Sequence, residues 1–137
     1  MEYASTASSL LLFAFVLSPL QGHATDRTIE MVGAQHAHAL STVYQELGAR
    51  ASEGRNVDQT LRHLSAAATL SLYERELSGS AAPIYCGSVS HAGGQVAVGK
   101  EYCAASMQLC SQVIGAAQVA RPHTSNHTTV TGCHKKD

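Results

Sequence analysis

The chain has 137 residues, a formal net charge of −1 and four cysteines. A nearly neutral protein has no electrostatic basis for binding nucleic acid or an anionic membrane, so we expect neither partner. The length suits a single domain, and the absence of tryptophan leaves a core built mainly from Leu, Val, Ile and Ala. Small side chains bury little area each, so we expect covalent cross-links to contribute to stability.

Residues 1–24 have the features of a secretory signal peptide. The segment 10–20, LLLFAFVLSPL, has the length of a signal-peptide core and is too short to span a bilayer. Cleavage after Ala24 would leave a mature chain of residues 25–137. No Lys or Arg precedes the apolar core, which leaves the exporting cell bacterial or eukaryotic. We therefore expect a secreted or periplasmic protein with no stable membrane insertion.

Residues 26–53 predict an amphipathic helix, because apolar or weakly polar residues recur every three or four positions. The predicted core-facing stripe consists of Ile29, Val32, His36, Leu40, Val43 and Leu47. Within it, His36 is expected to be a partly buried packing residue. Gly54 suits the left-handed position that often follows a helix.

A second helix is predicted over 57–78. Asn56 and Gln59 resemble a capping box at its start, and Gly79 suits its end. The connection to the first helix is so short that the two helices must run antiparallel. Residues 26–78 therefore predict a helical hairpin.

The rest of the chain predicts one more helix between two irregular segments. Pro83 and several glycines make residues 79–99 a loop or a short β-hairpin. A third helix is expected over 100–120, stopping before a proline. Residues 121–137 predict a polar, mobile tail. The fold class expected from the sequence is therefore mostly α.

The four cysteines, Cys86, Cys103, Cys110 and Cys133, predict two disulfides in an exported protein. On an intact helix, Cys103 and Cys110 would lie about 10 Å apart, beyond disulfide reach. Two pairings remain: Cys86–Cys103 with Cys110–Cys133, or Cys86–Cys110 with Cys103–Cys133. The first closes shorter loops and is preferred. The spacing matches no tetracysteine zinc motif.

The C-terminal tail offers two further possibilities. His123, His127 and His134 could bind a transition metal if the tail were preorganised. Asn126 begins an Asn-His-Thr sequon, which would be a glycosylation site in a eukaryotic host. Metal binding through the histidine tail is the alternative function.

The leading functional prediction is binding to another protein, of the inhibitor, immunity, accessory or effector type. No catalytic constellation or cofactor motif is present in the sequence, so we expect no enzymatic activity and no cofactor. Between Leu77 and Ala120 only Lys100 and Glu101 are charged, and cores of interfaces are similarly poor in charge. The predicted contact residues lie in and around the loop held by Cys86: Ile84, Tyr85, His91 and Gln95.

Overall fold

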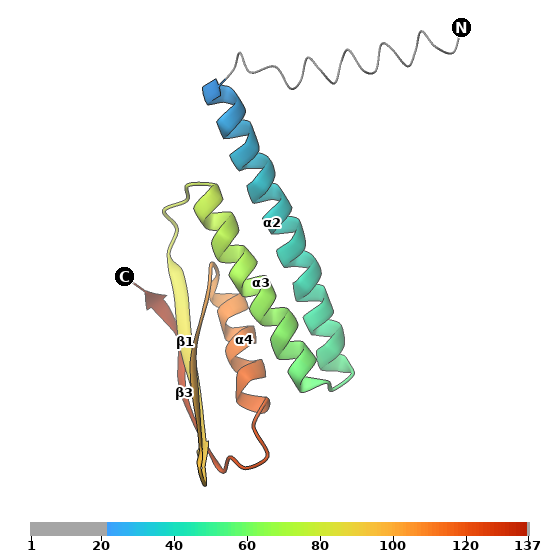
Figure 1. The fold of residues 1–137 in the computed structure, drawn as a ribbon, viewed down its shortest axis with the longest axis vertical. Helices are drawn as coiled ribbons and strands as arrows, with labels where there is room; N and C mark the ends of the chain where they lie inside the picture. Colours follow the sequence, from blue (N-terminus) through green and yellow to red (C-terminus); the bar gives the residue numbers. More distant parts are fainter. Residues whose placement is uncertain (1–21, 137) are drawn as a thin grey trace, which may run out of the picture.

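A computed structural model describes residues 22–136, so most of the predicted signal peptide lies outside the described residues. Within residues 22–136, three helices and three strands follow one another (Figure 1): α2 (Gly22–Glu53), α3 (Val57–Leu77), β1 (Ile84–Gly93), β2 (Val96–Ala104), α4 (Met107–Val119) and β3 (His127–Lys136). The predicted helical hairpin and a further helix are present, but the fold is mixed α/β rather than mostly α.

The turn between α2 and α3 is built from hydrogen bonds of the two helix ends. Asn56 caps α3, since the Gln59 N–H donates to its Oδ1 at 3.2 Å. The other half of the predicted capping box differs, because the Asn56 amide donates to the Gln59 side chain at 3.1 Å. The N–H of Asn56 instead donates to the Ala51 carbonyl at 3.0 Å, closing a Schellman motif at the end of α2.

The left-handed residue of that motif is Arg55, with φ 60°, and the prediction for Gly54 was wrong. Gly54 stays right-handed because its N–H still donates to the Arg50 carbonyl at 3.0 Å, which continues the helical turn by one residue. At the end of α3 the same motif occurs with Gly79 in the left-handed position, φ 65°, as predicted.

The face of α2 that packs on α3 consists mainly of small residues, together with the half-buried Tyr44, whose ring centroid lies 6.1 Å from that of His63 on α3. Its buried members are Ala34, Ala37, Ser41 and Gly48. A Cβ placed on Gly48 would lie 2.8 Å from the Leu64 side chain, so leucine fills the space that the glycine leaves. The Ser41 hydroxyl adds a hydrogen bond to the Ala67 carbonyl at 2.9 Å. The two helices therefore approach closely along this face.

The predicted core-facing stripe of α2 was wrong. Val32 and Val43 are 58% and 50% exposed, and His36 is exposed rather than a packing residue. Only the backbone is described at Ile29. The stripe lies about 120° round the helix from the small-residue face. Close approach of the two backbones, rather than side-chain size, decides which face is buried.

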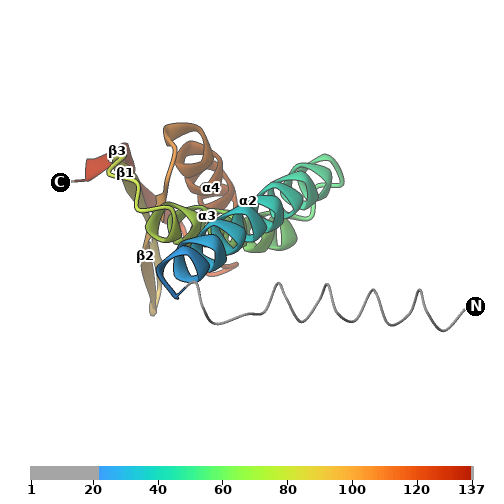
Figure 2. The same cartoon turned by 90° about the horizontal axis from the view of Figure 1, so that it is seen from above.

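The three strands form one antiparallel sheet in the order β2-β1-β3. Figure 2 shows α3 between α2 and the sheet. Residues 79–99 contain the predicted β structure, but β1 is longer than expected and the hairpin turns at Gly94 and Gln95. Gly94 has φ 58°, the conformation that the first residue of a tight hairpin turn needs.

Two predictions for the C-terminal third were wrong. Residues 100–104 continue β2, pairing with β1, and α4 begins only after Ser106, whose Oγ accepts the Leu109 N–H at 3.2 Å. Ladder pairing outweighs weak helical preference in this segment. The predicted polar tail, 121–137, contains β3, which pairs along the other side of β1 and satisfies its backbone there.

The core lies where α3, α4 and the sheet meet. Ala67, Ala104 and Val113 are fully buried there. His91 is also buried and links three elements, because its Nε2 lies 2.8 Å from the Ala117 carbonyl of α4 and its Nδ1 2.9 Å from the Thr128 hydroxyl of β3. A donated hydrogen bond to the carbonyl makes Nε2 the protonated nitrogen when the ring is neutral.

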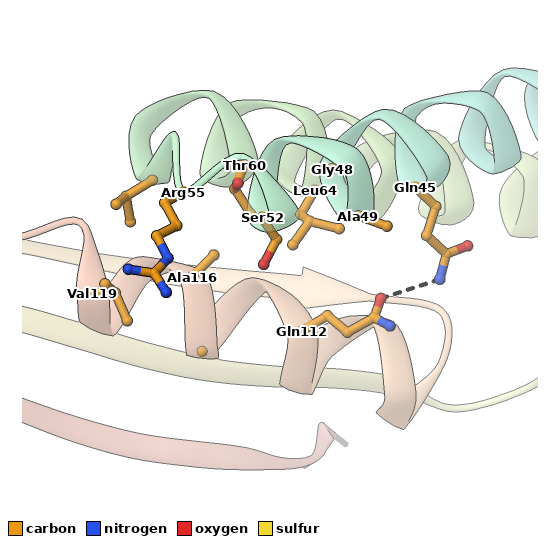
Figure 3. A pocket seen from close by; sticks show the side chains of 12 residues that line it. Gln45, Gly48, Ala49, Ser52, Arg55, Thr60, Leu64, Gln112, Ala116 and Val119 are labelled. Carbon is orange, nitrogen blue, oxygen red and sulfur yellow. Dashed lines mark hydrogen bonds between the residues drawn. The ribbon is translucent and has the colours of Figure 1, made fainter.

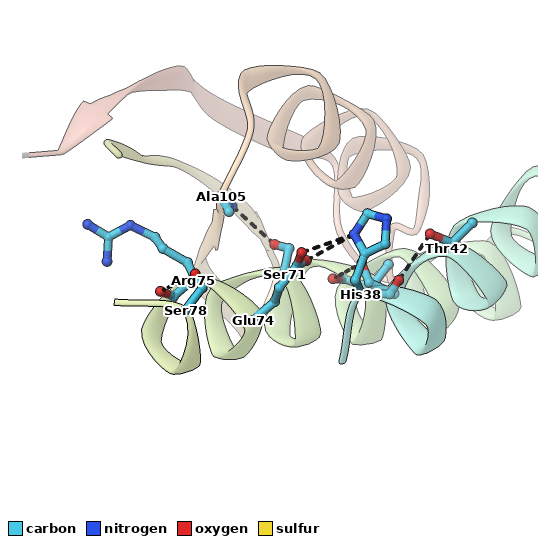
Figure 4. Close-up of polar contacts among 9 residues, drawn as sticks. His38, Thr42, Ser71, Glu74, Arg75, Ser78 and Ala105 are labelled. Carbon is cyan, nitrogen blue, oxygen red and sulfur yellow. Dashed lines mark hydrogen bonds and ion pairs between the residues drawn. The ribbon is translucent and has the colours of Figure 1, made fainter. Parts of the chain in front are cut away.

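Polar contacts also hold the helical hairpin in place (Figure 4). His38 Nδ1 of α2 lies 3.1 Å from the Glu74 carboxylate of α3. The Ser71 hydroxyl accepts the Ala105 N–H at 3.1 Å, which links α3 to the segment just after β2. The first contact is solvent-exposed and contributes little, whereas the second satisfies a buried hydroxyl.

The disulfides are Cys86–Cys103 and Cys110–Cys133, the preferred pairing. The prediction excluded a Cys103–Cys110 bond because it placed both residues on one helix. In the structure Cys103 lies on β2 instead, opposite Cys86 in the ladder. Cys110–Cys133 ties α4 to β3. Two disulfides indicate an oxidising, extracytoplasmic compartment. Of the helices in residues 22–136, none combines the length and apolar character that crossing a membrane requires.

Candidate functional site

A groove of about 610 Å³ lies where the C-terminal part of α2, the start of α3 and α4 meet (Figure 3). Most of its lining is apolar or small, including Gly48, Val57, Leu64, Gly115, Ala116 and Val119. The volume is in the range of ligand pockets, roughly 300–1,000 Å³. The groove can therefore accept an apolar group from a ligand or a partner.

The two ends of the groove differ in polarity. At one end Gln45 of α2 donates to Gln112 of α4 at 3.1 Å, so the two amides partly satisfy each other (Figure 3). At the other end stands Arg55, the one charged residue among the described residues that line the groove. Within residues 22–136 Arg55 makes no ion pair. The groove thus combines apolar walls with the cation of Arg55.

A second candidate surface runs along the outside of α2. We call it the outer stripe, and it consists of Val32, His36, Leu40, Val43 and Leu47. Leu40 is half-buried, Leu47 is 36% exposed and the two valines are more exposed still. The stripe extends about 22 Å along the helix. Contiguous exposed apolar patches with polar rims are typical of interaction surfaces.

The four predicted contact residues of the β-hairpin are not brought together. Ile84 and Tyr85 are half-buried at the start of β1, while Gln95 is exposed in the turn at its far end. His91 is 6% exposed, and both of its ring nitrogens are hydrogen-bonded within the protein. The sheet uses His91 for packing, and contact through Ile84, Tyr85 and Gln95 stays a prediction.

The three histidines of the predicted metal site lie on or just before β3. His123 is in the preceding loop, and His127 and His134 stand seven positions apart on the strand. In the part of the chain that the structure describes, the one group of three possible metal ligands within 4.8 Å of one another is Cys86, Glu101 and Cys103. Those cysteines are bonded to each other, so the histidine site also stays a prediction.

Asn126 is exposed in the loop directly before β3. Its backbone N–H donates to the Ala92 carbonyl at 3.0 Å, while the side chain is accessible. The predicted sequon is therefore placed where a glycan could be attached without unfolding the sheet.

No family model, curated protein or solved structure in the comparisons matches this chain. The candidate surfaces therefore rest on the geometry alone. Sequence reasoning missed the groove, because its walls come from three helices. Two local signals pointed to it: the glycine at position 115 inside a helix and the arginine that follows Gly54.

Proposed function

We propose that the protein is a small secreted or periplasmic binding protein that contacts another protein through the outer stripe of α2. The proposal rests on which face of α2 is buried. Small residues such as Ala37 and Gly48 are buried against α3, while Val32 and Val43 face solvent. A helix that serves only its own fold buries its larger apolar residues, since they gain more from leaving water.

The magnitude suggests how much of an interface the stripe provides. A fully buried valine or leucine contributes about 1.5–3 kcal/mol. Because the exposed members are about half covered already, Val32, Val43 and Leu47 together would contribute on the order of 3 kcal/mol. Association costs more than that in lost freedom of motion. The stripe is therefore the centre of an interface, and the partner also contacts its polar flanks.

The shape of the stripe favours a helical partner. Its residues follow the period of a straight α-helix, and helices pack along such rows by ridges into grooves. Glu46 and Arg50, each three positions after a stripe residue, are exposed and charged, like the rim of a protein–protein interface. The proposed occupant is an amphipathic helix of another protein that lies along α2.

Site-specific photo-crosslinking tests this proposal. A photoreactive residue at position 43 should crosslink the partner in the native extracytoplasmic medium, whereas one at position 62, an exposed site on α3, should not. Val43→Glu with Leu47→Glu should abolish partner retention. Gln35→Glu with Thr42→Glu adds the same charge on the same helix and should retain it.

Two results would contradict the proposal. One is equal crosslinking from positions 43 and 62. The other is a partner that the Val43→Glu, Leu47→Glu protein retains in full. Circular dichroism and disulfide content should match between the two double variants, because all four replaced side chains are at the surface of α2.

A further inference from the structure

Two residues that line the groove, Gly115 and Arg55, are residue types that their backbone conformations disfavour. Gly115 lies inside α4, where glycine is less favourable than alanine because it loses more conformational freedom on folding. Arg55 has φ 60°, where glycine would be less strained. Both exceptions occur at the same groove, and local exceptions of this kind concentrate at functional sites.

The fold itself does not require either residue. A Cβ added to Gly115 would meet no atom within 4 Å, so no neighbour demands a glycine there. The turn after α2 does not require arginine, since the same motif after α3 uses Gly79. What the two residues share is their effect on the groove: Gly115 leaves its wall open, and Arg55 places a guanidinium at one end.

The arginine side chain extends toward apolar residues at its own end of the groove. Figure 3 shows the Arg55 side chain reaching from the α2–α3 turn toward Ala116 and Val119 of α4. Val57, two positions after Arg55 and the first residue of α3, also lines the groove, and the N-terminus of α3 adds positive potential there. Asp58, in the same turn of α3, does not line the groove. This end of the groove therefore favours an anion next to an apolar surface.

We propose that the groove binds a single-chain amphiphile with a carboxylate head group, such as a medium-chain fatty acid. The hydrocarbon chain lies against Leu64, Ala116 and Val119, in the space that Gly115 leaves open. The carboxylate accepts two hydrogen bonds from the Arg55 guanidinium, the geometry that this pair prefers. At the far end, the Gln45–Gln112 hydrogen bond lowers the cost of covering both amides.

Titration calorimetry of the oxidised protein with laurate, below its micellar range, tests this site. Wild-type protein should bind one laurate, and lauryl alcohol more weakly because it lacks the charge. Arg55→Gly should weaken laurate binding about tenfold and leave lauryl alcohol unchanged. The same change should raise the melting temperature, since it relaxes the left-handed turn. A residue that served only the fold would not combine these two effects.

Gly115 supplies a matched pair of variants. Gly115→Leu should fill the groove and abolish binding of both ligands, whereas Gly115→Ala, which adds only the Cβ, should retain most of the laurate affinity. Circular dichroism and sedimentation should show both variants folded and in the same oligomeric state as wild type.

The proposal is wrong if wild-type protein shows no saturable laurate binding, or if Gly115→Leu binds laurate as wild type does. A different result would assign the groove to a peptide. In that case laurate does not bind, a photoreactive residue at position 52 in the groove crosslinks a protein, and Gly115→Leu abolishes this crosslink. The outer stripe is a separate surface, so Val43→Glu with Leu47→Glu should leave laurate binding unchanged.

Discussion

Replacing glycine by alanine at positions 48 and 115 should change stability in opposite directions, although both positions lie inside helices. The gain in helix propensity is about 0.8–1 kcal/mol at either position. At Gly115 nothing opposes it, because the new Cβ has no neighbour within 4 Å. Gly115→Ala should therefore stabilise the protein by about 0.8 kcal/mol.

At Gly48 the same Cβ would lie 2.8 Å from both Cγ and Cδ2 of Leu64. Leu64 is 7% exposed and belongs to the core. It also lines the groove, but the clash involves its Cγ as well as a terminal methyl, so rotating the methyl alone would not relieve it. Overpacking of this kind costs about 1–3 kcal/mol. Subtracting the propensity gain leaves Gly48→Ala neutral to about 2 kcal/mol destabilising. The propensity gain cancels between the variants, so their difference measures the packing cost alone.

Urea unfolding of the oxidised proteins, followed by the helical circular dichroism signal, measures both free energies. In a domain of this size 1 kcal/mol corresponds to about 4–8 °C in melting temperature. Adding Leu64→Ala to Gly48→Ala should recover part of the packing cost, since the two residues are in contact. Equal stability of Gly48→Ala and Gly115→Ala would refute the close approach of α2 and α3.

Three further predictions concern the sheet. Replacing Cys110 and Cys133 by alanine should cost about 3 kcal/mol and speed amide exchange in β3, because the bond closes a loop with a sequence separation of 23. His91→Leu should cost about 1–3 kcal/mol in urea unfolding by leaving the Ala117 carbonyl without its partner. Burial raises the pKa of Tyr102 above its usual 10.0, so the unfolded phenol ionises first. Stability should therefore fall as the pH rises above 10 through the folded pKa, less steeply in Tyr102→Phe.

The elements that the sequence predicted well are those specified by neighbouring residues. Helix α3 begins after the cap residue Asn56 and ends before Gly79. A short turn between two helices can only make an antiparallel hairpin. The segments predicted poorly depend on distant partners. Residues 100–104 have no decisive local preference, and they become a strand because β1 supplies the hydrogen bonds. The C-terminal segment becomes β3 for the same reason.

The outer stripe shows where hydrophobic patterning fails. The spacing of Val32, Leu40, Val43 and Leu47 correctly indicates a helix, but not which of its faces is buried. That choice depends on the shape of the neighbouring helix, since Leu64 of α3 fits over Gly48 and a larger residue there would have to displace it. A pattern weighted by side-chain size assigns such a small-residue face to the solvent.

The sequence by itself determined the two helices of the hairpin, their antiparallel course and the expectation of two disulfides, because caps, periodicity and cysteine content act locally or through composition. Only the tertiary structure decided the sheet, the buried face of α2 and the groove beside Arg55. Each of these joins segments far apart in the chain, so its stability depends on contacts that exist only after folding.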